Sequence, residues 1–228
     1  MPSSFVVTGG ARGVGAAIVA ELRAAGHHVE VIDVLNGQDA GSLVDARLAA
    51  ERAEAVAPLR GWVNNAAVFE DALVHLDPSA VLDTIARNLA PAVVGTSVAV
   101  SHFLANSRPG SIVNVSSHQA QRPVAGALPY ATAKAAIEGL TRATAVDYGR
   151  DGIRANAVAL GTIETERMSQ QVRSSAGEYH ALGRFGTASE VASTVAWLLS
   201  DASSFVTGAV IPVDGGRSIF GRDPEERL

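Results

Sequence analysis

The stretch Thr8-Gly9-Gly10-Ala11-Arg12-Gly13-Val14-Gly15 decides the fold of this chain. It follows an apolar, strand-like segment and opens a segment with helical periodicity. Glycines allow a tight strand-to-helix turn, and the free N–H groups of a helix N-terminus attract a pyrophosphate. By itself the motif is weak evidence, because glycine-rich turns of this kind also occur for packing alone.

Outward from this turn, apolar runs alternate with helical patterns along the whole chain. Strands are predicted at Phe5–Thr8, His28–Asp33, Gly61–Asn64, Ser111–Ser116, Ile153–Val158 and Ala209–Val213. Helices are predicted at Gly13–Ala25, Ala46–Ala57, Pro78–Phe103 (with a possible break at Pro91), Pro129–Tyr148 and Ala188–Ser200, the last capped by Thr187. This alternation predicts an α/β fold: one Rossmann-like domain over residues 1–228, with a doubly wound parallel sheet and helices on both faces.

The pattern is shortened after the second strand. Residues 34–44 are too few for a crossover helix followed by another strand, since such a connection needs about a dozen residues or more. Any strand near Ser42–Asp45 would be reached by a loop. We therefore expect one patch of the sheet to lack helical cover on the side where Asp33 ends its strand.

Asp33 lies about 20 residues beyond the glycine-rich turn, where an acid can bind the ribose hydroxyls of an adenine dinucleotide. Its carboxylate would repel a 2′-phosphate, whereas Arg12 in the turn would attract one. We predict NAD, with NADP as the less favoured cofactor. A cap or turn role for Asp33 remains the alternative.

Lys134 is the only lysine in the chain, and it follows Tyr130 by four residues. On a helix this spacing places the two side chains on one face. A nearby ammonium favours the phenolate and lowers the phenol pKa from about 10 towards neutrality. Tyr130 is therefore predicted to act as a general acid/base.

Composition narrows the function classes. The net charge of −5 argues against a nucleic-acid partner, and the chain has no cysteine for disulfides, thiol catalysis or metal binding. No histidine pair has metal-site spacing, so no metal is predicted. Neither a signal peptide nor an 18-residue apolar span is evident. We expect a cytoplasmic protein that binds no membrane.

Several motifs together resemble the short-chain dehydrogenase/reductase family of the single-domain type. Besides the glycine-rich turn and Tyr130…Lys134, they are Asn64-Asn65-Ala66-Ala67, Arg87-Asn88-Leu89, Ile112–Ser117, Asn156–Gly161 and Phe205–Gly208 through Asp214–Gly216. Their order and spacing cover nearly the whole chain. The resemblance implies a nicotinamide-dependent oxidoreductase that exchanges a hydride with a secondary alcohol or ketone.

The resemblance also implies roles for individual residues. The catalytic set would be Tyr130 as acid/base, Lys134 as its tuning ammonium, Ser117 (rather than Ser116) at the substrate oxygen, and Asn88 holding a relay water. The cofactor would be bound by Gly9, Arg12, Gly13, Val14, Gly15, Asp33, Asp45, Ala46, Asn65, Ala66, Tyr130, Lys134, Ile163 and Thr165, with Asp45 and Ala46 at the adenine ring. Outside this context, Ser117 would be read as a turn residue and Asn88 as a cap.

Three departures from the family pattern stand out. Ala67 replaces a glycine, Leu160 replaces a proline, and the segment after Asp33 is shortened. None removes a catalytic group. His118 beside Ser117 suggests a serine hydrolase, but the Gly-x-Ser-x-Gly elbow is absent. We expect His118 to line the substrate pocket or to lie exposed in its loop.

Specificity is expected to depend on His118–Leu128 and Glu164–Leu182, the latter including Glu166 and Arg167. The substrate would be a modest alcohol or ketone. Long small-residue faces on the helices after Asn88 and Tyr130 favour a homo-oligomer, a tetramer or a dimer. Two other functions remain open: an NADPH-dependent oxoacyl carrier-protein reductase, and a catalytically silent dinucleotide-binding regulator.

Overall fold

The computed structural model describes residues 2–165, 168, 170, 173, 175 and 178–221. Six strands form one parallel sheet in the order β2-β1-β3-β4-β5-β6. The strands are β1 (Ser4–Thr8), β2 (His28–Ile32), β3 (Leu59–Asn64), β4 (Gly110–Ser117), β5 (Ile153–Leu160) and β6 (Val210–Val213). All neighbouring strands pair in parallel, so their carboxyl ends lie at one edge of the sheet. The prediction of a Rossmann-like parallel sheet is confirmed.

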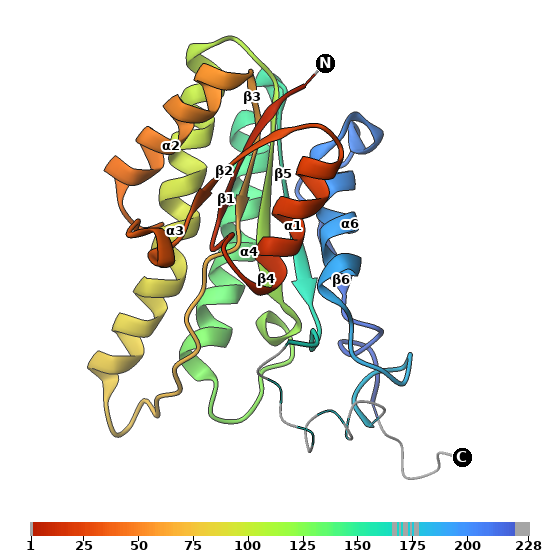
Figure 1. Cartoon of the computed structure of the whole chain (residues 1–228). Coiled ribbons are helices and arrows are strands. Elements are labelled where there is room, and N and C mark those ends of the chain that lie inside the picture. The colour runs from red at the N-terminus through yellow and green to blue at the C-terminus, as the bar shows by residue number, and fades with distance from the viewer. Residues whose placement is uncertain are drawn as a thin grey trace.

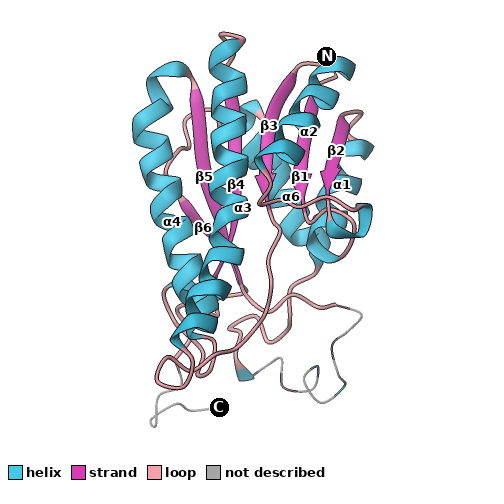
Figure 2. Ribbon diagram, turned by 90° about the vertical axis from the view of Figure 1, so that its left-hand side faces the viewer, coloured by secondary structure: helices cyan, strands magenta, loops and turns pink. Residues whose placement is uncertain are grey.

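Helices cover both faces of the sheet (Figures 1 and 2). On one face, α1 (Gly13–Ala24) packs against α6 (Ala188–Leu199). On the other face, α2 (Leu43–Val56), α3 (Pro78–Ala105) and α4 (Leu128–Tyr148) pack side by side. The predicted Thr187 cap of α6 is present and forms a full capping box: Thr187 accepts a hydrogen bond from the Glu190 N–H, and the Glu190 carboxylate accepts one from the Thr187 N–H (2.8 Å).

The segment after β2 differs from the prediction. Asp33 caps a short 3₁₀ helix, Val34–Asn36, and Ser42 then caps α2, which begins at Leu43. Residues 34–56 are all described and contain no strand, so Ser42–Asp45 opens a helix. Because α2 packs against β1 and β2, the expected gap in helical cover is wrong. The shortening instead leaves β2 as the edge of the sheet.

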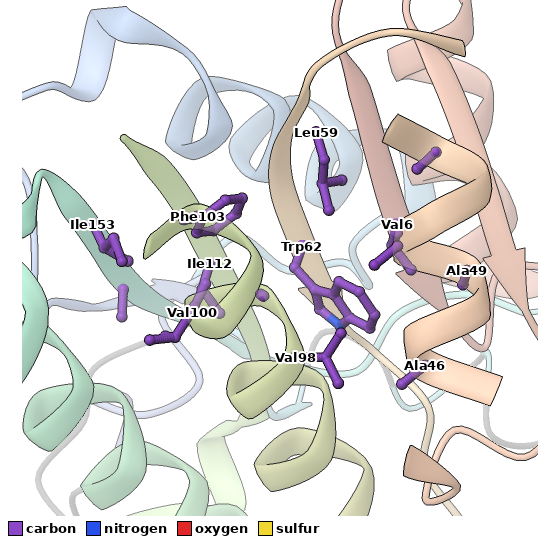
Figure 3. Packing of buried hydrophobic residues seen from close by; sticks show 14 of the residues in the cluster. Val6, Ala46, Ala49, Leu59, Trp62, Val98, Val100, Phe103, Ile112 and Ile153 are labelled. Carbon is purple, nitrogen blue, oxygen red and sulfur yellow. The ribbon is translucent and has the colours of Figure 1, made fainter. Parts of the chain in front are cut away.

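The core between the sheet and α2/α3 is built around Trp62 on β3 (Figure 3). Its indole is fully buried beside Val98 of α3, and Ala46 and Ala49 of α2 lie over Val6 of β1. Small residues on α2 let the helix approach the sheet closely. A second cluster, on the opposite face, joins Val7, Ile18, Val63 and further apolar side chains of α1 and α6.

The helix α3 runs unbroken from Pro78 to Ala105 with Pro91 inside it. Pro91 lacks an N–H, so the Arg87 carbonyl loses its helical partner, yet the expected break does not occur. Among the described residues, α3 is the one helix long and apolar enough to cross a membrane. Here it is a core helix, with its apolar side packed on β3, β4 and the neighbouring helices.

Candidate active site

The candidate site lies at the carboxyl edge of the sheet, where Thr8, Asn64, Ser117 and Leu160 end strands β1, β3, β4 and β5. The chain runs from β1 to β2 on one side and returns to β3 on the other. Such a reversal opens a crevice outside the strand ends. Residues that are far apart in sequence meet there.

The glycine-rich turn has the geometry that a close-lying phosphate requires. Gly9 has a φ of 64°, and a side chain there would meet Ala66 Cα at 2.9 Å. A side chain at Gly15 would meet the Gly9 carbonyl oxygen at 2.0 Å, so this glycine lets α1 pack onto the turn. Gly13 has a φ of 56°, and nothing lies within 4 Å of the position of a Cβ. The open side of the turn therefore faces the N–H groups that begin α1, where a pyrophosphate fits.

Asn65 and Ala66 fix this turn to the end of β3. The Asn65 side chain donates to the carbonyls of Thr8 and Gly9 at 3.0 Å each. The backbone N–H groups of Asn65 and Ala66 both donate to Thr8 Oγ1, at 2.9 and 3.1 Å. The two predicted residues thus border the turn, and Val14 packs its side chain into the core behind it.

Asp33 lies against the same turn. The backbone N–H of Ala11 donates to its Oδ2, and that of Leu35 donates to its Oδ1, each at 3.0 Å. Asp33 therefore does act as a helix cap. The same position places its carboxylate beside the open glycine-rich turn. The Arg12 side chain is exposed and has no hydrogen-bond or ion-pair partner in the described part of the chain.

The structure separates Asp45 and Ala46 from this group. Both lie in the first turn of α2, where the Asp45 carboxylate accepts a hydrogen bond from the Asp39 N–H (2.8 Å). Ala46 has no exposed surface and packs in the core (Figure 3). Its expected contact with an adenine ring is wrong, because the shortened segment makes residue 46 part of a helix that covers the sheet.

Tyr130, Lys134 and Ser117 meet at the ends of α4 and β4. Tyr130 and Lys134 share one face of α4, with the ammonium 5.4 Å from the centre of the phenol ring. The Ser117 hydroxyl lies close enough to the Tyr130 phenol to act on its pKa. Lys134 is buried and donates to the Val115 carbonyl at 2.7 Å. The predicted cluster is therefore assembled.

Burial shapes the electrostatics of this cluster. Burial raises the pKa of Tyr130 to about 12, although the neighbouring Ser117 side chain acts to lower it. Burial also lowers the pKa of Lys134 to about 8. The direction for Tyr130 is opposite to the sequence expectation, because removal of the phenolate from water outweighs the neighbouring groups. The unliganded phenol is a proton donor at neutral pH.

Phe69 borders the cluster from the loop before α3, and Asn88 of α3 holds that loop. The Asn88 side chain accepts a hydrogen bond from the Val68 N–H (3.0 Å) and donates to the Thr84 carbonyl (2.9 Å). Its carboxamide thus holds this loop, and its role with a relay water stays a prediction. The Phe69 ring lies 5.0 Å from that of Tyr130. Sequence reasoning missed Phe69, since no motif marks this loop.

A buried polar network behind the site was also missed. Asn64 donates to Asn114 Oδ1 (2.8 Å) and accepts from the Trp62 indole (2.9 Å), and Asn114 donates to Thr141 (2.8 Å). Asn64 and Asn114 are partners in the register of β3 and β4. The sequence signal that could have predicted this network is the spacing of Asn64 two residues after Trp62 on one strand, which places both side chains on the same face. The network fixes β3 and β4 relative to α4, which carries Tyr130.

Ser116 points away from Tyr130, to Glu138 Oε1 at 3.0 Å. This placement agrees with the choice of Ser117 over Ser116 as the serine beside the phenol. Ile163 pairs in parallel with Gly186 after β5, and the Thr165 carbonyl accepts from the Met168 N–H (3.1 Å). Both lie in the segment that follows the carboxyl end of β5.

The expected substrate segment is described in part. Glu166 and Arg167 lie outside the described residues. His118 is buried and lines a cavity of about 350 Å³. The cavity is lined by His118, Arg122, Pro123, Val124, Glu178, Tyr179, Arg217, Phe220 and Gly221. His118 follows Ser117 directly in the chain, whereas Ser117, Tyr130 and Lys134 are not among the lining residues.

Comparison with known proteins agrees with this geometry. A family model described as Enoyl-(Acyl carrier protein) reductase matches residues 42–218. The chain is 33% identical to 2,5-dichloro-2,5-cyclohexadiene-1,4-diol dehydrogenase of Sphingobium indicum, over 93% of this chain and 96% of that protein. It is 34% identical to the 3-oxoacyl-[acyl-carrier-protein] reductase MabA of Mycobacterium avium, over 93% and 89%.

A solved structure gives the same result for the fold. Aldohexose dehydrogenase of Thermoplasma acidophilum in ligand-free form superposes with a TM-score of 0.87 at 28% identity, covering 100% of this chain and 97% of that one. The chain belongs to the short-chain dehydrogenase/reductase family. It is an NAD(P)-dependent oxidoreductase that acts on CH–OH groups.

Proposed function

We propose that this enzyme transfers a hydride between NAD and a secondary alcohol or ketone, with Tyr130 as the general acid/base. The observation that carries the proposal is the assembly of Ser117, Tyr130 and Lys134 at the same carboxyl edge of the sheet as the open glycine-rich turn. The nicotinamide ring supplies or accepts the hydride when bound. The residues of this chain supply the proton and the orientation.

The proton step belongs to Tyr130. In the reduction direction, its phenol donates a proton to the carbonyl oxygen as that oxygen becomes negative. Ser117 lies beside the same phenol, so its hydroxyl can donate a second hydrogen bond to the substrate oxygen. Lys134 places a positive charge behind the ring and stabilises the phenolate that remains. Its other N–H groups can hold the nicotinamide ribose.

The preference for NAD follows from the charge at the adenosine side. The Asp33 carboxylate lies 3.0 Å from the Ala11 N–H in the glycine-rich turn, where it would repel a 2′-phosphate. We expect NADH to bind at least about 10-fold more tightly than NADPH. Titration of each cofactor by nicotinamide fluorescence measures the ratio. Asp33→Ala is expected to reduce this ratio, and an unchanged ratio would remove Asp33 from the ribose.

Arg12 supports the competing assignment, an NADPH-dependent oxoacyl carrier-protein reductase. Its guanidinium is exposed in the turn and can pair with a 2′-phosphate. The similarity to an oxoacyl carrier-protein reductase favours the same alternative. Tighter binding of NADPH, with turnover of an oxoacyl thioester in preference to simple ketones, would select it over the NAD enzyme.

A catalytically silent regulator is the third possibility, and the intact catalytic cluster argues against it. The decisive comparison is Tyr130→Phe with the wild type. Loss of the phenolic hydroxyl is expected to lower kcat by at least about 1,000-fold, because it removes the proposed proton donor beside Ser117. Cofactor affinity should change by less than about 3-fold, since the ring remains.

The measurement is initial-rate kinetics on a panel of secondary alcohols and ketones, with cofactor binding followed in parallel. Tyr148→Phe, at the far end of α4, is the matched control and should retain full activity. An active Tyr130→Phe enzyme would overturn the acid/base assignment. Cofactor binding by the wild type without turnover of any substrate would favour the regulator.

We also propose a homo-oligomer, a tetramer or a dimer, formed through α3 and α4. The two helices pack side by side and present exposed apolar residues outward, among them Leu82, Val93 and Val146. Light scattering coupled to size-exclusion chromatography tests the state directly. A cytoplasmic location stays a prediction.

A further inference from the structure

The cavity lined by His118, the residue that follows Ser117, contains two arginines that have no carboxylate partner among the described residues. Arg122 and Arg217 both line it, and neither forms an ion pair there. Elsewhere, most of the arginines in ion pairs meet a glutamate, as Arg108 meets Glu54 and Arg184 meets Glu190. An unpaired guanidinium in a concave site binds an oxyanion.

Arg217 is held in place by neutral groups. Its Nε donates to His118 Nε2 at 2.9 Å, and one terminal nitrogen, Nη1, donates to Thr162 Oγ1 at 2.9 Å. His118 is consequently neutral, because Nε2 accepts from Arg217 while Nδ1 donates to the Leu160 carbonyl (3.1 Å). Burial lowers the pKa of His118 and so favours this state. The second terminal nitrogen of Arg217, Nη2, has no hydrogen-bond partner among the described residues and remains available to a ligand.

Arg122 completes the charge. Its Nη1 donates to the carbonyls of Arg217, Ser218 and Phe220, at 3.0, 3.1 and 2.7 Å, which leaves Nε and Nη2 to the cavity. The two guanidiniums are close enough that the charge of Arg122 lowers the pKa of Arg217, in addition to the effect of burial. An anion between them would relieve this repulsion.

No negative group among the described residues forms an ion pair with either arginine, although the charge of Asp214 acts to raise the pKa of Arg217. Asp214 accepts hydrogen bonds from the N–H groups of Gly216 and Ser218, at 2.9 and 2.8 Å. Glu178 lines the cavity but bonds neither arginine in the described structure. The Tyr179 ring lies 5.4 Å from the Arg217 guanidinium and forms an apolar wall under it. The remaining wall, Pro123, Val124 and Phe220, suits a short carbon chain.

We propose that Arg122 and Arg217 form a carboxylate subsite, so that the substrate is a hydroxy acid or oxo acid whose reacting carbon faces Ser117 and Tyr130. The proposal rests on the oxidoreductase function proposed above. His118 connects the two parts, since it follows Ser117 in the chain and holds Arg217 through Nε2. The guanidinium groups would bind the carboxylate of the substrate through charge-assisted hydrogen bonds, because the planar guanidinium matches the geometry of a carboxylate.

The test compares oxo acids of increasing chain length with their primary amides, which have the same shape and no charge. The wild type should prefer the acid over the amide in kcat/KM by at least about 10-fold at one chain length. Arg217→Gln and Arg122→Gln should each lower kcat/KM for that acid by about 10- to 100-fold, mainly through KM. Turnover of the amide should change by less than about 3-fold.

Arg150→Gln is the matched control. Arg150 is exposed after α4, next to the amino end of β5 and hence at the opposite edge of the sheet. Equal kcat/KM for acid and amide at every length would overturn the subsite, as would a loss in Arg217→Gln that affects both equally. A preference for phosphate or sulfonate analogues over the carboxylate would overturn the ligand class.

A second measurement separates this proposal from the function on which it rests. Calorimetric titration of the preferred acid into Tyr130→Phe, with cofactor present, reports binding without turnover. The acid should bind Tyr130→Phe and fail to bind the variant that also carries Arg217→Gln. If no alcohol or ketone is turned over by the wild type, the oxidoreductase proposal fails. If ketones react but acid binding is insensitive to Arg217, only the subsite fails.

Discussion

Lys134 shows at the residue scale how a catalytic group can oppose stability. Its side chain is 2% exposed, and the only hydrogen bond it makes in the described structure is to the Val115 carbonyl. Burial lowers its pKa to about 8 from the ordinary 10.5. Below pH 8 the folded protein therefore holds a charged amine that would be better solvated in the unfolded chain. This cost is relieved as the pH rises from 8 through 10.5.

Replacement of Lys134 tests this destabilisation by the buried ammonium. Lys134→Met should unfold with a free energy about 1–3 kcal/mol larger than the wild type at pH 7, because a buried charge is replaced by an apolar chain of similar length. The gap should narrow by pH 10, where the lysine is neutral in the folded state. Urea unfolding at the two pH values measures it. A less stable variant at pH 7 would mean that the ammonium has compensating partners.

The sequence predicted the reactive residues of the site more successfully than the residues that surround and position them. We predicted Tyr130, Lys134 and Ser117 correctly as neighbours because their spacing, along a helix and after a strand, can be read from the sequence. The rise in the pKa of Tyr130 could not be predicted, because it depends on how deeply the ring is buried. Phe69 contributes to this burial from a loop that no sequence motif marks. Ala46 was misplaced because burial is decided by which element a residue joins.

At the scale of elements, Glu54 ties three segments together. It extends from α2 to Arg108 (2.9 Å), to His102 on α3 (3.0 Å) and to the Leu59 N–H at the start of β3 (2.8 Å). Burial raises the pKa of this carboxyl, but the hydrogen bonds from Arg108, Leu59 and His102 outweigh it and lower the pKa to about 2. The folded pKa lies below the unfolded value of 4.5, so the stabilisation is present above pH 4.5 and is lost as the pH falls towards 2.

Glu54→Gln is therefore expected to unfold more easily than the wild type by about 1–3 kcal/mol at pH 7. The difference should shrink at pH 3.5, where the unfolded carboxyl of the wild type is largely protonated. Urea unfolding at pH 7, 5 and 3.5 gives the comparison, with the exposed Glu51→Gln on the same helix as control. A difference that stays constant over this range would exclude the linkage to Glu54.

Most elements could be predicted because their periodicity and caps are local. Thr187 predicted the start of α6 as an N-cap, and the structure has that cap. The start of α2 could not be fixed, since Leu43 and Val44 also suit a strand. Their state is decided by tertiary packing: Ala46, Ala49 and Ala53 bury a face that only a helix presents together.

For the whole molecule, the shortened segment after Asp33 decides where the sheet ends. With no strand in residues 34–56, β2 is an edge strand. The even-numbered residues of β2 form the backbone hydrogen bonds to β1; for example, the Gly9 N–H donates to the Ile32 carbonyl. The backbone groups of Val29 and Val31 therefore point outward, away from β1. Exposed edges of this kind pair with other chains unless they are covered.

Two side chains cover this edge. Arg23 of α1 donates to the Val29 carbonyl at 2.9 Å. With its amide turned to satisfy both atoms, Gln38 donates to the Val31 carbonyl (2.9 Å) and accepts from Arg52 (2.9 Å). The segment that replaces the missing strand thus supplies one of the groups that protect the edge, and α1 supplies the other.

Removal of both groups tests this account of the shortened fold. The double variant Arg23→Ala/Gln38→Ala should self-associate beyond the wild-type oligomer, because two edge carbonyls lose their partners and become available to another chain. Sedimentation velocity at increasing concentration should show at least a roughly 3-fold larger fraction of heavy species, while Arg150→Ala should match the wild type. If the double variant sediments like the wild type, the edge of β2 is protected by its own short length and twist, and Arg23 and Gln38 serve only local packing.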